Sequence, residues 1–439
     1  MSVRITVIGT GYVGLVTAAG LSDFGNTVIA CDIDKVIIDK LSKGIPTIYE
    51  HDLEDYLQRN VTAGRLSFSS DVEYCLKNAD VIFVAVGTPD LIDGSVDLSQ
   101  INAVVESVAS NLNSYKIIII KSTVPVGTNR KIAKLLHEKT GEKNFAVVSN
   151  PEFLREGKAM HDFFHPDRVV LGCEDESARE VLKNIYRPLY LIQTPFVWCN
   201  FETAELIKYA ANAFLATKIT YINQMANLSE VVNADIHLIA KTMGMDGRIS
   251  PKFLHPGPGF GGSCFPKDTK AIASMGREYS VEMSLVEEVI RANENQKLQV
   301  VHRLKMIMGD LRGVVVSVLG VAFKAETDDV RESPSITIVK KLLDESAVVH
   351  VHDPKALENF QKAFAGAIGY FSDLDEAVVG AECLLILTEW NSYRGMDLLK
   401  IGSLMKSKII YDTRNVLDPE KARECGFKYF ATGRSSFLS

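Results

Sequence analysis

One cysteine lies in a setting that suits a nucleophile. Cys264 follows a run of glycine and proline in HPGPGFGGSCFPKD, residues 255–268, and Lys267 and Asp268 come shortly after it. A glycine-rich backbone can wrap closely around a ligand and turn its amides toward it. A nearby ammonium group favours the thiolate, which is the nucleophilic form of cysteine. The other six cysteines are better explained as small buried hydrophobic residues.

A lysine and an asparagine are separated by about one helical turn. Lys208 and Asn212 are four residues apart in a long, mostly apolar stretch, so they share one face of the predicted helix. A cation and an amide that point together could stabilise a developing oxyanion. The spacing alone fits a solvated polar stripe equally well.

The N-terminus carries a dinucleotide-binding pattern. GTGYVG, residues 9–14, follows an apolar strand and opens a helix, and a second strand ends at Asp32. The glycines allow a tight turn and bring the pyrophosphate of a dinucleotide to the backbone N–H groups. A carboxylate at this spacing would bind ribose hydroxyls and repel a 2′-phosphate, so NAD is favoured over NADP. The predicted NAD-binding residues here are Gly9, Gly11, Tyr12, Val13, Gly14 and Asp32.

Two further segments follow predicted strands. NPEFLREG, residues 150–157, and KSTVPVG, residues 121–127, both lie on turns at the carboxyl edge of a sheet, where open α/β sheets bind ligands. Thr123 is placed there to bind a water or a hydroxyl. In the C-terminal half, Lys324 and Arg331 stand where glycines would be, and cations can hold phosphates too. Taken alone, their acidic neighbours favour a solvated loop.

The elements that position these residues alternate between strand and helix. Continuous apolar strands separated by helices predict an α/β protein with two Rossmann-like doubly wound domains, joined by a long central helix and a helical connector. A faint repeat, from Asp71 and again from Asp373, supports the two-domain fold. We expect an NAD-binding domain over 1–200, a central helical domain over 201–310 that carries the Cys264 loop, and a second Rossmann-like domain over 311–439 that binds a different nucleotide. The expected strands are 3–8, 27–31, 81–86, 117–120, 145–148, 314–319 and 347–352, and the expected helices start near 202, 284 and 334.

Composition narrows the class of protein. With 46% hydrophobic and 23% charged residues the chain is typical of a globular protein, and a net charge of −7 argues against nucleic acid or anionic membrane as partners. We find no apolar run long enough to cross a bilayer and no signal-peptide pattern. Seven scattered cysteines without a CxxC pair indicate reduced thiols and a cytoplasmic location. His350 and His352 share a strand face but lack a third ligand, so we expect no metal.

With these pieces assembled, the chain resembles the UDP-glucose/GDP-mannose dehydrogenase family, and within it the UDP-glucose branch. The resemblance covers essentially the whole length and rests on motifs in a fixed order. They are GTGYVG, VGTP, STVPVG, NPEFLREG, KYAANAFLATK, GPGFGGSCFPKD and VAFKAETDDVRES.

The resemblance implies an activity and a mechanism. Two successive NAD-dependent oxidations at C6 would convert UDP-glucose to UDP-glucuronate, a precursor of polysaccharides, through a thiohemiacetal and a thioester on Cys264. Lys208 and Asn212 would steady the oxygen at C6. Asp268 and a water near Thr123 would accept and transfer protons, and Glu152 would help to activate the hydrolytic water.

The resemblance also extends the predicted sites and suggests a homodimer through the central helix. It implies that 201–310 is the dimerisation domain and that 311–439 binds the UDP-sugar. The implied NAD contacts are Thr88, Thr123, Glu156, Lys267 and Arg331. The implied substrate contacts are Glu152, Phe153, Leu154, Arg155, Lys208, Asn212, Phe253, Leu254, His255, Pro256, Gly257, Gly261 and Lys324, with Arg248 reaching the substrate of a neighbouring subunit. Arg414 is a weaker candidate for a sugar or phosphate contact.

Three alternatives stay open. A sister enzyme acting on GDP-mannose would share the chemistry and most motifs. A two-electron dehydrogenase of the same layout would need no nucleophilic cysteine. A silent nucleotide-sugar sensor would bind both ligands without turnover, but the intact set of Lys208, Asn212, Cys264 and Asp268 argues against it.

Overall fold

The computed structural model describes residues 3–141, 144–364 and 367–434, and its chain packs as two compact units. The first unit comprises residues 1–211 with 274–281, and the second comprises 212–273 with 282–439. A single helix, α10 (Phe201–Val232), begins in the first unit and ends in the second. The predicted helix near 202 is therefore confirmed.

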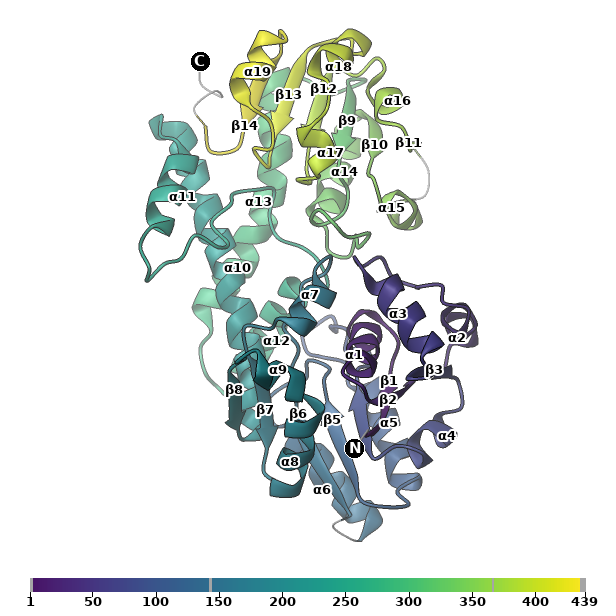
Figure 1. The fold of residues 1–439 in the computed structure, drawn as a ribbon. Coiled ribbons are helices and arrows are strands. Elements are labelled where there is room, and N and C mark those ends of the chain that lie inside the picture. The colour runs from purple at the N-terminus through teal and green to yellow at the C-terminus, as the bar shows by residue number, and fades with distance from the viewer. Residues whose placement is uncertain (1–2, 142–143, 365–366, 435–439) are drawn as a thin grey trace. The chain divides into compact units, whose positions relative to one another are not determined.

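The first unit is built on an eight-stranded sheet with helices on both faces (Figure 1). Its strand order is β3-β2-β1-β4-β5-β6-β7-β8, and every neighbouring pair is parallel except β6 and β7. The strands are β1 (Arg4–Ile8), β2 (Thr27–Cys31), β3 (Leu66–Ser69), β4 (Val81–Val84), β5 (Lys116–Ile120), β6 (Phe145–Ser149), β7 (Val169–Cys173) and β8 (Phe196–Cys199). The helices are α1 (Tyr12–Asp23), α2 (Lys35–Ser42), α3 (Leu53–Thr62), α4 (Val72–Lys77), α5 (Ser99–Ser110), α6 (Thr128–Thr140), α7 (Ala159–Phe164), α8 (Glu176–Ile185) and α9 (Arg187–Leu191).

Alternating side chains of the central strands pack into two separate hydrophobic cores, one on each face of the sheet. Phe83 and Ile119 pack into the core on one face of the first sheet, whereas Ile82 and Ile118 pack into the core on the other. Because both faces are covered, the strands show no polar alternation, which is why they read as continuous apolar runs. The strand order reverses at β1, and this reversal creates the crevice where doubly wound sheets bind ligands.

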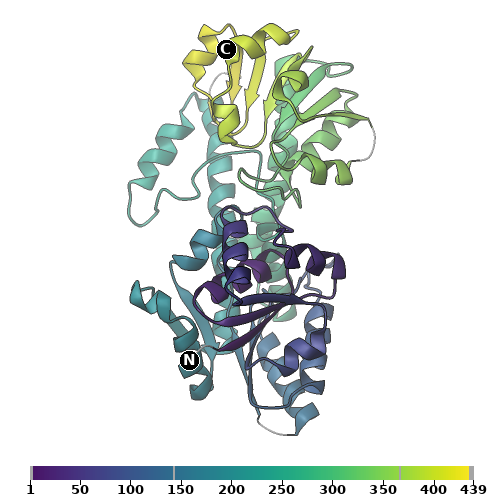
Figure 2. The ribbon, with the colours of Figure 1, turned by 45° about the vertical axis from the view of Figure 1, so that its right-hand side comes forward.

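The second unit holds a six-stranded parallel sheet, ordered β11-β10-β9-β12-β13-β14. Helices again lie on both of its faces, as the green and yellow ribbons show in Figure 2. The strands are β9 (Val315–Leu319), β10 (Val348–His352), β11 (Ile368–Phe371), β12 (Cys383–Ile386), β13 (Ile409–Asp412) and β14 (Lys428–Ala431). The remaining helices, of which α12 runs from the second unit into the first, are α11 (Ile236–Gly244), α12 (Phe265–Glu278), α13 (Ser284–Met308), α14 (Pro334–Asp344), α15 (Leu357–Ala363), α16 (Leu374–Val378), α17 (Asn391–Arg394), α18 (Leu398–Leu404) and α19 (Pro419–Glu424).

The two sheets repeat one topology, as the sequence repeat predicts. Strands β3-β2-β1-β4-β5-β6 correspond in order to β11-β10-β9-β12-β13-β14. The repeated aspartates do the same work in both, since Asp71 accepts from Tyr74 N at the start of α4 and Asp373 accepts from Glu376 N at the start of α16. Short-range capping thus fixes the same strand-to-helix turn twice.

Three predictions from the sequence concern disulfides, membrane-spanning helices and metal ligands. The structure describes all seven cysteines, and none of them forms a disulfide. Across the described ranges, no helix combines the length and the apolar character that a bilayer crossing requires. His350 and His352 lie on β10, where His350 Nδ1 is 3.2 Å from Ala377 O and His352 Nδ1 is 2.9 Å from Tyr393 Oη.

Candidate active site

The glycine loop of the first unit connects β1 to α1. A side chain at Gly9 would place its Cβ 2.7 Å from Ala85 O, and one at Gly14 would place it 1.8 Å from Gly9 O. These two glycines are therefore required by packing, whereas a Cβ at Gly11 would meet open space. Within the described residues no side chain caps α1 at Gly11. The first-turn N–H groups are left facing that space, an arrangement that fits the pyrophosphate of a dinucleotide.

Asp32 lies directly after β2 and is bound to the glycine loop. Its Oδ2 accepts from Thr10 N and from Thr10 Oγ1, both at 2.8 Å, while Oδ1 accepts from Asp34 N at 3.1 Å. The residue is only partly buried. It can therefore shape the loop and still accept from a ribose, which fits the predicted role.

A residue that the sequence reasoning missed joins the glycine loop to NPEFLREG. Glu50 is buried, and its carboxylate accepts from the Tyr12 hydroxyl, from Gly157 N at 2.7 Å and from Ala159 N at 2.7 Å. Burial raises the pKa of Glu50, although these donors oppose the shift. The sequence gives no spacing signal for such a residue, because Tyr12 is 38 positions away and its two backbone partners, Gly157 and Ala159, are more than a hundred positions away.

Two predicted catalytic residues, Lys208 and Glu152, form a buried ion pair that the sequence did not predict. Lys208 Nζ on α10 lies 2.8 Å from Glu152 Oε1, and the two side chains are 4% and 6% exposed. Burial alone would raise the pKa of Glu152, but Lys208 and the backbone N–H of Leu154 hold it below its usual value. Glu152 is therefore a carboxylate at neutral pH. The solvated stripe considered for Lys208 is excluded by this burial.

A second buried lysine lies beside this pair. Lys121, at the end of β5, donates to Asn150 Oδ1 at 3.3 Å, and Asn150 also accepts from the Tyr186 hydroxyl. Burial lowers the pKa of Lys121 to about 8, with Glu152 opposing the shift and Lys208 adding to it. The sequence placed this lysine in the KSTVPVG turn but assigned it no role.

The remaining predicted residues of the first unit lie on the turns that follow β4, β5 and β6. Thr88 Oγ1 donates to Thr123 O at 3.0 Å, so the turns after β4 and β5 are joined. Arg155 is turned to Asp162, with Nε 2.8 Å from Oδ2. Phe153 stacks its ring under Arg168, Leu154 packs against the core, and Glu156 is half-buried near Tyr12.

In the second unit, the predicted residues Asn212, Lys267 and Asp268 form one polar cluster. Asp268 is 1% exposed, and its two oxygens accept from Asn212 Nδ2 at 2.6 Å and from Lys267 Nζ at 2.7 Å. Asp268 N in turn donates to Cys264 O, so Cys264 is the residue immediately before helix α12 and accepts its first backbone hydrogen bond. The N-terminus of a helix favours a thiolate. Ser263 Oγ lies 3.6 Å from Cys264 Sγ.

The loop before Cys264 is held by amide side chains that the sequence reasoning did not assign to it. Gly257 N donates to Asn223 Oδ1 at 2.8 Å, and Gln296 Nε2 donates to Gly257 O at 2.9 Å. Asn293 bonds both backbone groups of Phe260, at 2.8 and 3.0 Å. Side chains of α10 and α13 therefore replace the hydrogen bonds that a glycine-rich loop cannot make to itself. The available signal was polar residues on otherwise apolar helix faces.

Two glycines of this loop exclude side chains. A Cβ at Gly261 would lie 2.3 Å from Glu332 O, and one at Gly262, where φ is +84°, would lie 2.8 Å from the Phe323 ring. Leu254 is buried, and Phe253 lies in the left-handed region at φ +64°. Pro256 is buried next to Gly257, and His255 is exposed.

Three predicted basic residues lie in the second unit, apart from this cluster. The guanidinium of Arg331 pairs with Asp329, with Nη2 2.7 Å from Oδ2, and Lys324 Nζ lies 5.5 Å from the centre of the Phe323 ring. Arg248 is highly exposed after α11 and pairs with Asp246. Their predicted roles toward NAD, the sugar nucleotide and a second subunit stay predictions.

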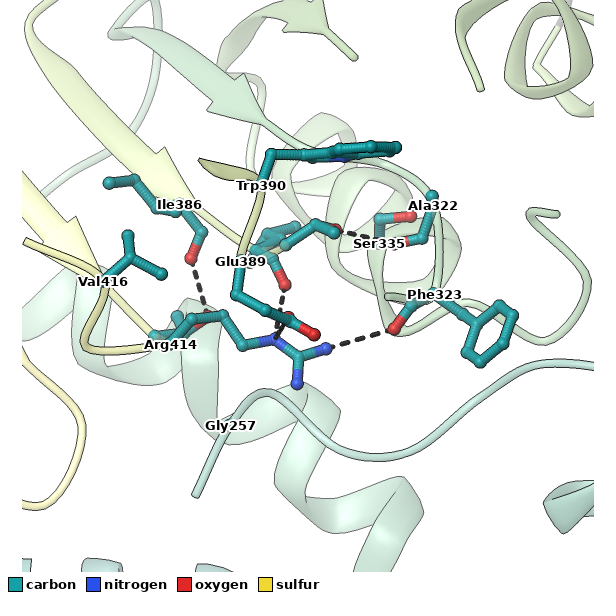
Figure 3. A network of polar contacts seen from close by, with 12 residues as sticks. Gly257, Ala322, Phe323, Ser335, Ile386, Glu389, Trp390, Arg414 and Val416 are labelled. Atoms are coloured by element: carbon teal, nitrogen blue, oxygen red, sulfur yellow. Dashed lines mark hydrogen bonds and ion pairs between the residues drawn. The ribbon is translucent and has the colours of Figure 1, made fainter. Parts of the chain in front are cut away.

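The weaker candidate, Arg414, is bound tightly at the end of β13 (Figure 3). Its Nε donates to Leu387 O at 2.8 Å, its Nη2 donates to Phe323 O at 3.1 Å, and Glu389 Oε2 lies 3.2 Å from Nε. The guanidinium is directed at Gly257, where a Cβ would come within 2.9 Å of Nη1. Arg414 thus presents a cation to the loop of Cys264.

The fold and these residues define a dinucleotide-binding α/β protein with a cysteine at the end of a glycine-rich loop. Residues 3–190, 202–295 and 317–419 match the NAD-binding, central and UDP-binding domains of the UDP-glucose/GDP-mannose dehydrogenase family. The chain therefore belongs to this family, and the resemblance is confirmed.

Individual relatives cover nearly the whole chain. It is 44% identical to a UDP-glucose 6-dehydrogenase of Rhizobium meliloti over 98% of this chain and 99% of the relative. It is 41% identical to UDP-glucose 6-dehydrogenase TuaD of Bacillus subtilis, over 98% and 93% of the two chains. A solved structure of a UDP-glucose dehydrogenase from Pyrobaculum islandicum shares 38% identity and a TM-score of 0.92, over 99% and 98% of the two chains.

Replacing Asp32 by alanine should weaken NAD binding by about 1–3 kcal/mol, because a charged acceptor of hydrogen bonds is lost. Since Asp32 also holds Thr10, Thr10→Val separates the two effects: it removes the Oγ1 bond and leaves the carboxylate in place. Isothermal titration with NAD gives both affinities. An unchanged affinity for Asp32→Ala would remove Asp32 from the site.

Replacing Lys121 by methionine should change how stability depends on pH. Because the pKa of Lys121 is lowered to about 8, the unfolded chain binds more protons above that pH, and the free energy of unfolding rises with pH there. From pH 7 to 9 the wild type should gain about 1 kcal/mol relative to Lys121→Met. Urea unfolding at both pH values measures the difference, and parallel pH curves would contradict the buried charge.

Proposed function

We propose that this chain is an NAD-dependent UDP-glucose 6-dehydrogenase, which converts the 6-hydroxyl of UDP-glucose to the carboxylate of UDP-glucuronate. Family membership and the names of its full-length relatives support the substrate. The observation that carries the proposal is the buried pairing of four predicted catalytic side chains, Lys208, Glu152, Asn212 and Asp268. Lys208 binds Glu152, and Asn212 binds Asp268, which also binds Lys267.

In the first oxidation the sugar hydroxyl must lose a proton while C6 loses two electrons together with a hydrogen, as a hydride. When bound, NAD takes up those electrons in each of the two oxidations. Lys208 supplies a cation for the oxygen at C6, and its buried position makes that charge effective. Asn212 adds an amide donor, and a water near Thr123 or Asp268 receives the proton.

In the second oxidation Cys264 retains the intermediate. Its thiolate adds to the aldehyde carbon, which forms a C–S bond and turns the carbonyl oxygen into a thiohemiacetal hydroxyl. Loss of a hydride from C6, which bound NAD would accept, and of the hydroxyl proton from this adduct gives a thioester. Water then adds to the thioester carbon, the C–S bond breaks, and the thiol is regenerated with the free acid. Glu152, a carboxylate at neutral pH, is the base that activates this water.

The proposal keeps the predicted binding residues in their roles. Gly9 to Gly14 and Asp32 hold NAD with Thr88, Thr123 and Glu156, and the loop from Phe253 to Gly261 holds the sugar nucleotide with Lys324 and Arg414. Lys267 and Arg331 stay proposed NAD contacts. The seven cysteines, none of which is in a disulfide, suit a cytoplasmic enzyme.

We also infer a homodimer through α10. In the second unit this helix exposes Phe214, Tyr221 and Leu228, each seven residues after the last, with Val231 and Val232 beyond them. Exposed fractions of 45–66% for three large apolar side chains on one stripe are unusual for a solvated helix. A second copy of the same stripe would cover them in an isologous interface.

The first test is the yield of NADH from a limiting amount of UDP-glucose with excess NAD. We expect two NADH for each UDP-glucose and no free aldehyde. One NADH would point to a two-electron dehydrogenase. None with UDP-glucose but turnover of GDP-mannose would assign the sister activity, and none with either would leave a silent sensor.

The role of Cys264 is tested by Cys264→Ala. Losing the nucleophile should slow carboxylate formation by at least about 10³-fold while NAD binding is retained. Cys425→Ala, which changes another partly buried cysteine of the second unit, is the control and should keep full activity. Loss of NAD binding in Cys264→Ala would mean that the residue is structural.

The dimer is tested by Leu228→Glu, which places two carboxylates in the proposed interface. We expect sedimentation equilibrium to give twice the chain mass of 48.4 kDa for the wild type and the chain mass for the variant. Leu399→Glu alters an equally exposed leucine on α18 and should leave the dimer intact. A dimeric Leu228→Glu would rule out this stripe.

A further inference from the structure

A buried glutamate on α10 takes no part in the chemistry proposed above. Glu205 is 2% exposed and lies three residues before Lys208 on the same helix. Its Oε2 accepts from Gly127 N at 2.6 Å, and its Oε1 accepts from Asn129 N and from Asn129 Nδ2, both at 2.7 Å. Burying a carboxylate is costly unless it is fully hydrogen-bonded, and here three short bonds meet that need.

The three donors belong to the start of helix α6. Gly127, in the left-handed conformation at φ +87°, is the residue before the helix, and within the described chain no hydrogen bond from its own segment's side chains caps it. Glu205 therefore caps α6 from another element. A serine or aspartate at the start of α6 would satisfy the same N–H groups locally. A cap from α10 does more, because it fixes the two helices relative to each other.

The turn that Glu205 holds at Gly127 also carries a predicted catalytic residue. The turn KSTVPVG runs from β5 into α6 and carries Thr123, while α10 carries Lys208. The other end of the turn is held as well, since Ser122 Oγ donates to Val86 O at 2.7 Å and Thr88 Oγ1 donates to Thr123 O. Val126 N donates to Met275 Sδ at 3.4 Å. Glu205 is the charged anchor of this turn.

We propose that Glu205 is a positioning residue, which holds the Thr123 turn in register with Lys208 by capping α6 from α10. The inference rests on the proposed function, because it assumes that Thr123 and Lys208 serve the same reaction. A shift of about 1 Å between two catalytic groups can lower a rate by about 10²-fold. A loosened cap thus acts on turnover more than on substrate affinity.

The test is Glu205→Gln. The amide keeps one acceptor oxygen for Asn129 but turns an N–H₂ group toward Gly127 N, so the bond at 2.6 Å is replaced by two opposed donors. We expect kcat for UDP-glucose oxidation to fall about 10- to 100-fold at 25 °C, with KM for UDP-glucose within about threefold of the wild type.

The matched control is Glu202→Gln, one turn earlier on α10. Glu202 also links α10 to α6, through Arg130 at 3.0 Å, but does so on the surface. This variant should keep kcat within about twofold of the wild type. If Glu205→Gln lowers the melting temperature yet leaves kcat within about twofold, Glu205 is structural only and the proposal fails.

A second variant decides the matter if Glu205→Gln does not fold. Asn129→Ala removes one of the three bonds and leaves both backbone donors in place. We expect a kcat about three- to tenfold below the wild type, and an unchanged kcat would overturn the positioning role. Failure of the proposed function is distinguishable, because it would appear as a wild type that forms no NADH from UDP-glucose.

Discussion

The charged and polar side chains buried along helix α10 are the constraint on which this architecture depends. Helix α10 carries Glu205, Lys208, Asn212 and Asn223 in buried positions, and none can be left without a polar partner inside a protein. Each partner comes from a different segment: the start of α6, the turn after β6, helix α12 and the loop at Gly257. The helix is thus both the longest element and the origin of the bonds that place the functional turns.

Much of the fold is legible in the sequence because it rests on local patterns. Apolar runs predicted seven of the strands to within two residues at either end, and the absence of Pro and Gly predicted α10. Other strands, among them β3, β7, β8, β11, β13 and β14, were not predicted. Strand β7 runs antiparallel to β6, which makes the first sheet mixed rather than purely parallel. Nothing local marks that reversal, since the direction of a strand is set by its distant neighbour.

The residues of the candidate site likewise divide into those that the sequence predicted and those that it did not. Residues in motifs, such as Asp32, Lys208 and Cys264, were predicted because their types and spacing limit the chemistry. Glu50 and Glu205 were not, because a positioning carboxylate is defined by backbone N–H groups far away in the sequence. A comparison of the two sheets shows that equivalent positions in the sequence need not have equivalent roles. Asp353 stands after β10 where Asp32 stands after β2, yet its carboxylate is buried and accepts from Val321 N, Ala322 N and Trp390 Nε1.

The scaffold of the Cys264 loop has a consequence for how the chain folds. The loop's hydrogen bonds come from Asn223 on α10 and from Asn293 and Gln296 on α13, which lie 33–39 residues away on opposite sides of it. Contacts of this separation form only after the intervening chain has closed. The loop therefore cannot take its final form until both helices have paired. Before that pairing the loop lacks these hydrogen bonds, so the setting that favours a reactive Cys264 thiol exists only once both helices are in place.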